Sequence, residues 1–155
     1  MKKHIYNFDE LSAMLDKENT AVYVYACLLW LGIAPNDIQN VTAECFNENM
    51  HTINVRYRVI FIKNKPINDA LSSYKSSLPI TAQERRSADA SLAECGLDWK
   101  YIYKMQLFAS KRELEKSGQP EDIILFREMA AAIGKSDSQI KSEYNDYKAS
   151  LQGLM

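Results

Sequence analysis

Cysteine and histidine are the typical ligands of zinc, and cysteine is also a redox group. The three cysteines, Cys27, Cys45 and Cys95, are odd in number and far apart, and no two form a C-x-x-C pair. His4 and His51 are equally isolated, and no H-E-x-x-H segment occurs. Zinc ribbons, disulfide frameworks and paired-histidine metal sites need such spacings. We therefore predict free thiols in a reducing cytoplasm and no metal site.

Phosphate-binding loops and catalytic carboxylate pairs are not supported either. The sequence lacks G-x-G-x-x-G, G-x-x-x-x-G-K-[ST] and G-x-S-x-G, so no cofactor is predicted. Glu113 and Glu115 alternate with three basic residues on one predicted helix, which is typical of a solvated, self-compensating face. Arg85 and Arg86 follow Glu84 near a helix start. They are candidates for a phosphate contact, although exposed arginines are usually only solvated.

Length and charge restrict the class of protein. With 155 residues, 46% hydrophobic and 25% charged, the sequence fits one globular domain, and we assign residues 1–155 to it. The 19 basic and 20 acidic side chains give a net charge of −1, so the strong positive field of a typical DNA-binding protein is absent. The longest apolar stretch, residues 21–35, is too short to span a bilayer. No signal peptide is recognised.

Hydrophobic spacing and capping residues predict a mostly α-helical (α+β) domain of several helices with one small β-hairpin in its first half. The hairpin is expected at residues 52–62, which are rich in Val, Ile, Tyr and Phe. Residues 20–31 are apolar nearly all round and should form the central buried helix. The other helices are predicted at residues 7–16, 35–41, 66–74, 81–95, 98–118, 121–132 and 136–151.

Three segments in chain order carry a further pattern. Residues 28–38, LLWLGIAPNDI, form an apolar helix followed by Gly-Ile, and residues 41–53 lead into the hairpin. Residues 133–136, IGKS, are followed by Tyr144 ten residues after Gly134. In order and spacing these segments resemble the motifs T-G-L-R-x-x-E-L, L-x-W-x-D-I-D and L-G-H-S…Y of the tyrosine recombinase (phage integrase) catalytic domain. The resemblance covers the chain from about residue 20 to its end.

The resemblance implies a chemistry that this sequence no longer carries in full. In that family a tyrosine attacks the scissile phosphate, two arginines hold its oxygens, and a lysine and histidines move protons. Tyr144 matches the nucleophile. The other matched positions lack the family's residues: the arginines fall on Ala34 and on Leu107 (or Gln106 after a one-residue slip), and the histidines on Lys104 (or Tyr103) and Lys135. We therefore expect Tyr144 to be a vestige or a packing residue, because it also lies on the apolar stripe of the last helix.

Three functions follow from this comparison. The first is a catalytically inactive, integrase-like domain, bacterial or phage-encoded, acting as a binding or protein-interaction module. It would lack a separate N-terminal DNA-binding domain and would bind DNA weakly or not at all. It would form a homo-oligomer through the C-terminal helix at residues 138–151. The second is a DNA-binding regulator related to recombination or integration. Its nucleic-acid-binding residues would be Arg85, Arg86, Lys104, Lys111 and Lys135. The third is a divergent active recombinase using Tyr144, Arg112 and Lys135.

Overall fold

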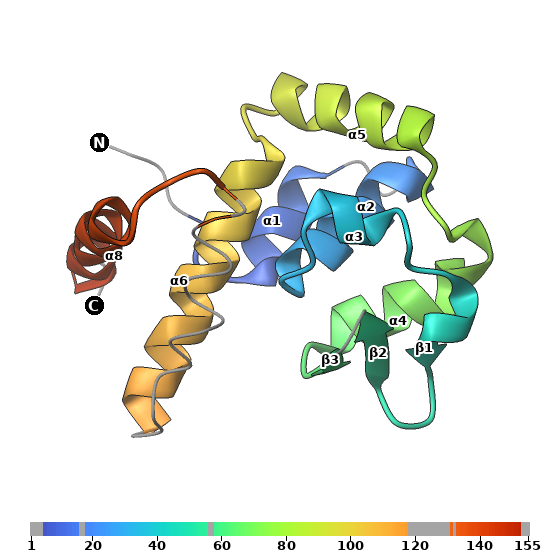
Figure 1. Cartoon of the computed structure of the whole chain (residues 1–155), viewed down its shortest axis with the longest axis horizontal. Helices are drawn as coiled ribbons and strands as arrows, with labels where there is room; N and C mark the ends of the chain where they lie inside the picture. Colours follow the sequence, from blue (N-terminus) through green and yellow to red (C-terminus); the bar gives the residue numbers. More distant parts are fainter. Residues whose placement is uncertain (1–4, 16–17, 56–57, 118–130, 132, 153–155) are drawn as a thin grey trace.

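The computed structural model describes residues 5–15, 18–55, 58–117, 131 and 133–152 of the chain (Figure 1). The predicted helix at residues 121–132 lies outside this part, apart from residue 131. In chain order the elements are α1 Phe8–Met14, α2 Thr20–Trp30, α3 Pro35–Ile38, η1 Ala43–Cys45, β1 Phe46–Asn47, β2 Thr52–Val55, β3 Arg58–Phe61, α4 Lys65–Tyr74, η2 Lys75–Ser77, α5 Ala82–Glu94, α6 Trp99–Ser117 and α8 Asp137–Gln152. The prediction of a mostly helical α+β fold is confirmed.

Helix α2 is the centre of the described core. Its residues from Val22 to Leu29 are all buried, and α4, α5 and α6 pack against it. A helix that is apolar on every side can be stable only when neighbours cover each side. Asn19 caps its start by accepting a hydrogen bond from the Val22 N–H, as its position before an apolar run favours.

Two glycines end helices in the manner that the sequence predicts. Gly32 has φ +87° after α2, and its N–H donates to the Leu29 carbonyl while the next N–H donates to the Leu28 carbonyl. Gly96, with φ +77°, makes the equivalent pair of bonds after α5. A residue without a Cβ adopts this left-handed conformation at little cost, and the bonds satisfy carbonyls left free at the helix end.

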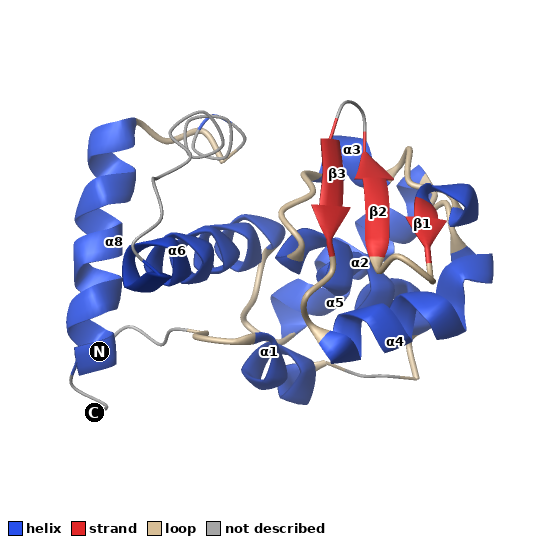
Figure 2. Ribbon diagram, turned by 90° about the horizontal axis from the view of Figure 1, so that it is seen from below, coloured by secondary structure: helices blue, strands red, loops and turns tan. Residues whose placement is uncertain are grey.

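The β element is larger than predicted. The hairpin at residues 52–62 is present, with Thr52 opposite Phe61 and Val55 opposite Arg58. A third strand, β1, pairs antiparallel with β2, so the sheet order is β1-β2-β3 (Figure 2). No sequence pattern predicts β1, because two residues are too few to show alternation. The predicted helix at residues 35–41 is also shorter, since α3 ends at Ile38.

Helix α8 lies on the side of α6 that faces away from α2 (Figure 1). Its apolar stripe is turned inward: Ile140, Tyr144 and Tyr147 are buried. Figure 2 shows α8 crossing one end of α6, so that α6 lies between α8 and the rest of the fold. The stripe proposed to dock on a neighbouring copy is thus covered by the chain itself in this structure.

Candidate functional site

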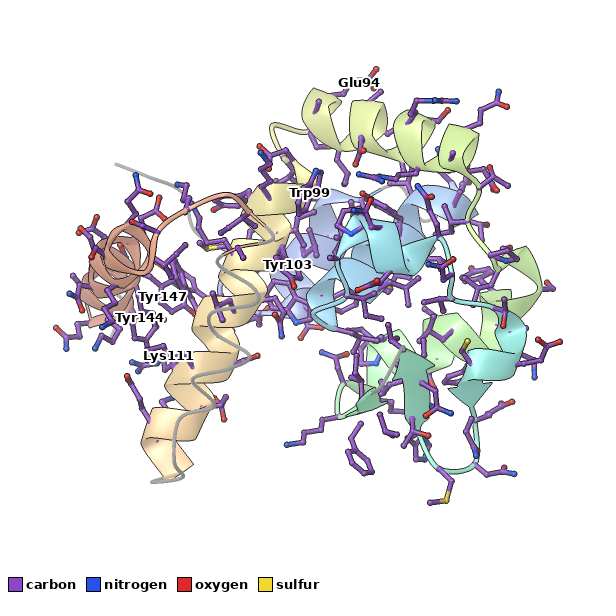
Figure 3. All side chains as sticks on the ribbon, in the orientation of Figure 1. Glu94, Trp99, Tyr103, Lys111, Tyr144 and Tyr147 are labelled. Carbon is purple, nitrogen blue, oxygen red and sulfur yellow. The ribbon has the colours of Figure 1, made fainter. Side chains whose placement is uncertain are left out.

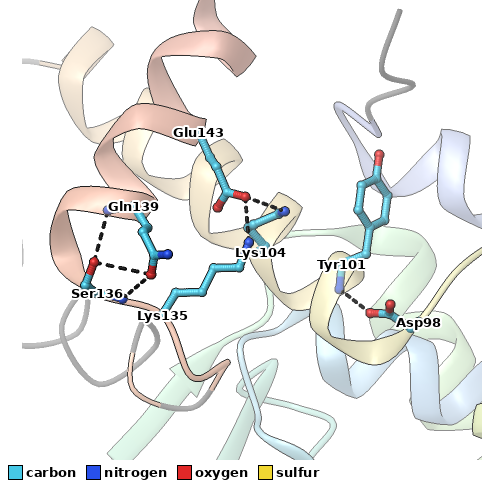
Figure 4. Close-up of polar contacts among 7 residues, drawn as sticks. All are labelled: Asp98, Tyr101, Lys104, Lys135, Ser136, Gln139 and Glu143. Carbon is cyan, nitrogen blue, oxygen red and sulfur yellow. Dashed lines mark hydrogen bonds and ion pairs between the residues drawn. The ribbon is translucent and has the colours of Figure 1, made fainter.

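The α6–α8 contact contains most of the residues that the sequence singles out, and local capping fixes both helices. Asp98 caps α6 by accepting a hydrogen bond of 2.8 Å from the Tyr101 N–H (Figure 4). At the start of α8, the Gln139 N–H donates to Ser136 Oγ and the Ser136 N–H donates to Gln139 Oε1. This reciprocal capping box is the one predicted from the sequence Ser-Asp-Ser-Gln. It sets where α8 begins and which face meets α6.

Glu143 joins two of the candidate cations. Its Oε1 atom lies 2.6 Å from Lys135 Nζ and 3.4 Å from Lys104 Nζ (Figure 4). Burial by itself raises the pKa of Glu143, but the hydrogen bond from Lys135 and the charge of Lys104 outweigh it, so the pKa lies below its usual value. Lys104 and Lys135, which stand at the positions that the resemblance assigns to histidines, therefore lie together around a carboxylate of their own chain.

Tyr144 is held in an aromatic cluster. Its side chain is only 2% exposed, and its ring lies 5.4 Å from that of Phe108 and 6.1 Å from that of Tyr147, between ring centroids. Figure 3 shows Tyr144 and Tyr147 directed from α8 toward α6. Two ammonium groups approach the same ring, Lys148 at 4.8 Å and Lys111 at 5.4 Å from its centroid. Cations at such distances are attracted by the electron-rich face of the ring.

The hydroxyl of Tyr144 is committed to a carboxylate. It donates a hydrogen bond of 2.9 Å to Glu115 Oε2 on α6. Burial raises the pKa of Tyr144, and the neighbouring Glu115 raises it further, against a smaller opposing effect of Arg112. A phenol beside a carboxylate resists ionisation because the phenolate would be repelled. Glu115 is itself exposed, as expected for the solvated face predicted on this helix, and it is also the acceptor for the tyrosine.

The two arginines lie elsewhere, on α5. Arg85 Nε is 3.8 Å from Asp89 Oδ2, and its guanidinium also donates to Asn36 Oδ1 in α3. Arg86 is exposed. Figure 1 places α5 apart from α8, so the five predicted nucleic-acid-binding residues fall into two groups. Lys104, Lys111 and Lys135 gather at α6 and α8, whereas Arg85 ties α5 to α3.

The remaining positions implied by the resemblance have no phosphate-binding character. Ala34 occupies the N-cap position of α3, and Leu107 is 4% exposed within the core. Arg112, which the third hypothesis used, is half-buried, and its charge acts on both Tyr144 and Tyr147. It is thus a basic residue close to the tyrosine, but it belongs to the rim of the aromatic cluster.

A hollow of about 300 Å³ adjoins this cluster and was not foreseen from the sequence. Aromatic side chains from the N-terminal segment, α1, α2 and α8 line it together with polar residues of α6. They include Tyr6, Phe8, Trp30, Tyr147, Arg112, Glu113 and Lys116. Burial raises the pKa of Tyr147 to about 12. No sequence signal could reveal this hollow, because its walls come from segments more than 100 residues apart.

Among the described residues, no group of three or more His, Cys, Asp or Glu side chains that could hold a metal ion occurs. Cys27 is buried, and burial raises the pKa of its thiol, while Cys45 is half-buried and Cys95 exposed. His51 lies in an exposed turn, and His4 falls outside the described part. Within the same residues, no helix has the length and apolar character needed to cross a membrane.

Replacing Glu143 with Gln should lower the free energy of unfolding by about 1–2 kcal/mol at pH 7, because two charged hydrogen bonds lose their anionic acceptor. The pKa of Glu143 is lower in the folded chain than in the unfolded one. Its contribution is therefore complete above the unfolded pKa of about 4.5 and is lost as pH falls through the folded pKa. Urea unfolding between pH 3 and 7 measures this difference.

The matched control is Glu94→Gln, an exposed glutamate on α5 (Figure 3). This variant should lose none of the wild type's stability at pH 7, because an exposed carboxylate at the C-terminal end of a helix makes no favourable contribution. Equal stability of Glu143→Gln and Glu94→Gln at pH 7 would show that the lysine–glutamate cluster contributes nothing to holding α8.

Comparison with known proteins does not extend the resemblance stated above. Searches of protein families, of curated proteins and of solved structures find no match for this chain.

Proposed function

We propose that this chain is a catalytically inactive binding or protein-interaction module, with a plan that resembles the tyrosine recombinase catalytic domain. One observation carries the proposal: the Tyr144 hydroxyl is already bonded to Glu115 in a position that is almost fully buried. A tyrosine used for covalent catalysis must present its oxygen to a phosphate and lose its proton. Tyr144 does neither in this arrangement.

The electrostatics around Tyr144 support the same proposal. Transfer of a phosphoryl group needs cations aimed at the phosphate oxygens as charge develops. Lys104 and Lys135 both point to Glu143, and a phosphate would have to displace this carboxylate. Leu107 offers no charge at the position where the resemblance implies an arginine. Loss of one such arginine costs about 10³–10⁵ in rate in related phosphoryl transfers.

We therefore expect no DNA cleavage. Incubation of the full chain with supercoiled plasmid, followed by denaturation, should yield neither nicked DNA nor a protein–DNA adduct above a no-protein blank. Tyr144→Phe is the matched variant, because it removes only the hydroxyl and keeps the ring in its aromatic cluster. An adduct formed by the wild type and abolished in Tyr144→Phe would contradict the proposal and favour the divergent recombinase.

DNA binding, the second function considered, is expected to be weak. Of the five candidate cations, Arg85 faces Asp89, and Lys104 and Lys135 share Glu143, so few charges are left to displace counterions. Fluorescence anisotropy with a duplex at physiological salt should give a Kd weaker than about 1 µM. A sub-micromolar Kd that weakens with salt and is lost in Arg86→Ala or Lys111→Ala would favour the regulator.

A further inference from the structure

Exposed apolar side chains gather at one place in the described part of the chain. Met50, Val59 and Phe61 are 63%, 55% and 66% exposed, and they are the large hydrophobic residues with high exposure there. All three belong to the small sheet: Met50 to the β1–β2 turn, and Val59 and Phe61 to β3. The large apolar side chains elsewhere in the described part of the chain are buried in the core or pack against it. Two of the three, Val59 and Phe61, share strand β3, which makes this strand the candidate contact surface.

Strand β3 also has a free edge. The sheet order β1-β2-β3 puts β3 at its border, visible in Figure 2. The Ile62 N–H donates to the His51 carbonyl at 2.7 Å, so in this antiparallel ladder Ile62 and Ile60 direct their backbone groups toward β2. Val59 and Phe61, at alternate positions, direct theirs outward. Among the described residues no backbone group pairs with them.

We propose that this edge pairs with the same edge of a second copy, in an antiparallel two-fold dimer. With Val59 opposite Phe61 of the second copy, the axis passes between the two Ile60 residues. Both outward-facing residues then exchange N–H···O=C bonds with their counterparts, giving four bonds in all. The two sheets join into one.

The pairing is favoured because β3 is complementary to itself. In this register each exposed Val59 lies beside an exposed Phe61 of the second copy on the same face of the joined sheet, and aromatic–β-branched pairs of this kind stabilise sheets. No charged residue stands at these two positions. An edge that exposes apolar side chains and unpaired backbone groups is otherwise an aggregation site. Because β3 is only four residues long, the dimer should be weak and depend on concentration.

Sedimentation velocity of the full chain, from low micromolar to several hundred micromolar, tests the proposal. The wild type should shift from monomer to dimer over this range. Val59→Lys/Phe61→Lys places like charges opposite each other and should weaken association by at least about tenfold. Val59→Lys/Phe61→Glu places a lysine opposite a glutamate at both pairs and should restore the dimer.

Met50→Lys is the matched control, since it changes an equally exposed apolar residue off the β3 edge, and it should dimerise like the wild type. Circular dichroism and thermal unfolding establish that each variant is folded. A wild type that stays monomeric throughout the range overturns the proposal. So does a dimer unaffected by the two lysines, or one that the lysine–glutamate variant fails to restore. The dimer is independent of the evidence for the proposed function, because strand β3 contains neither Tyr144 nor any of the candidate DNA-binding residues.

Discussion

The candidate site depends on one packing constraint, the removal of a row of aromatic side chains from water between α6 and α8. Phe108 lies 5.4 Å from both Tyr144 and Tyr147, and Tyr147 lies 5.4 Å from Tyr6 of the N-terminal segment, between ring centroids. Large aromatic side chains contribute much of the apolar area that a small protein buries. Docking of α8 therefore brings the C-terminal helix, α6 and the start of the chain together.

This packing decides what the polar groups of the site can do. Once the Tyr144 ring is buried, its hydroxyl needs a partner, because an unpaired buried polar group is costly. Glu115 supplies that partner. Glu143 plays the same part for Lys104 and Lys135. Lys104 and Lys135 are thus neutralised by a carboxylate of their own chain, which agrees with the near balance of 19 basic and 20 acidic side chains in the whole sequence. This is the physical basis for proposing a module without strand-transfer chemistry.

The sequence predicts the local features of this fold well. Asn7, Thr81 and Ser136 act as helix caps, and Gly32 and Gly96 end helices, because each signal depends only on residues a few positions away. The stripe of the last helix correctly predicts its buried face. The two-residue strand β1 was missed, since pairing with β2 rather than its own pattern creates it.

The contacts of the site could not be predicted, because they join residues that are far apart in the sequence. Tyr144 and Glu115 are 29 residues apart, and Lys104 and Glu143 are 39 apart, so each contact exists only after α8 has docked. Periodicity assigned Glu115 to a solvated face, although it is also within reach of the tyrosine. The hollow beside Tyr147 and the free edge of β3 likewise follow from tertiary arrangement. Sequence spacing identifies candidate site residues such as Tyr144 and Lys104, but it does not show which carboxylate each of them contacts.

The ionisation of Tyr144 tests the central claim most directly. Tyrosine labelled with ¹³C at Cζ reports the protonation state of each phenol by NMR, and Tyr144→Phe identifies the signal of Tyr144. We predict that Tyr144 remains protonated at pH 10.5, where ordinary exposed tyrosines, with a pKa of about 10, are largely ionised. A Tyr144 that ionises together with the exposed tyrosines would contradict the account, and one that ionises before them would also indicate an activated nucleophile.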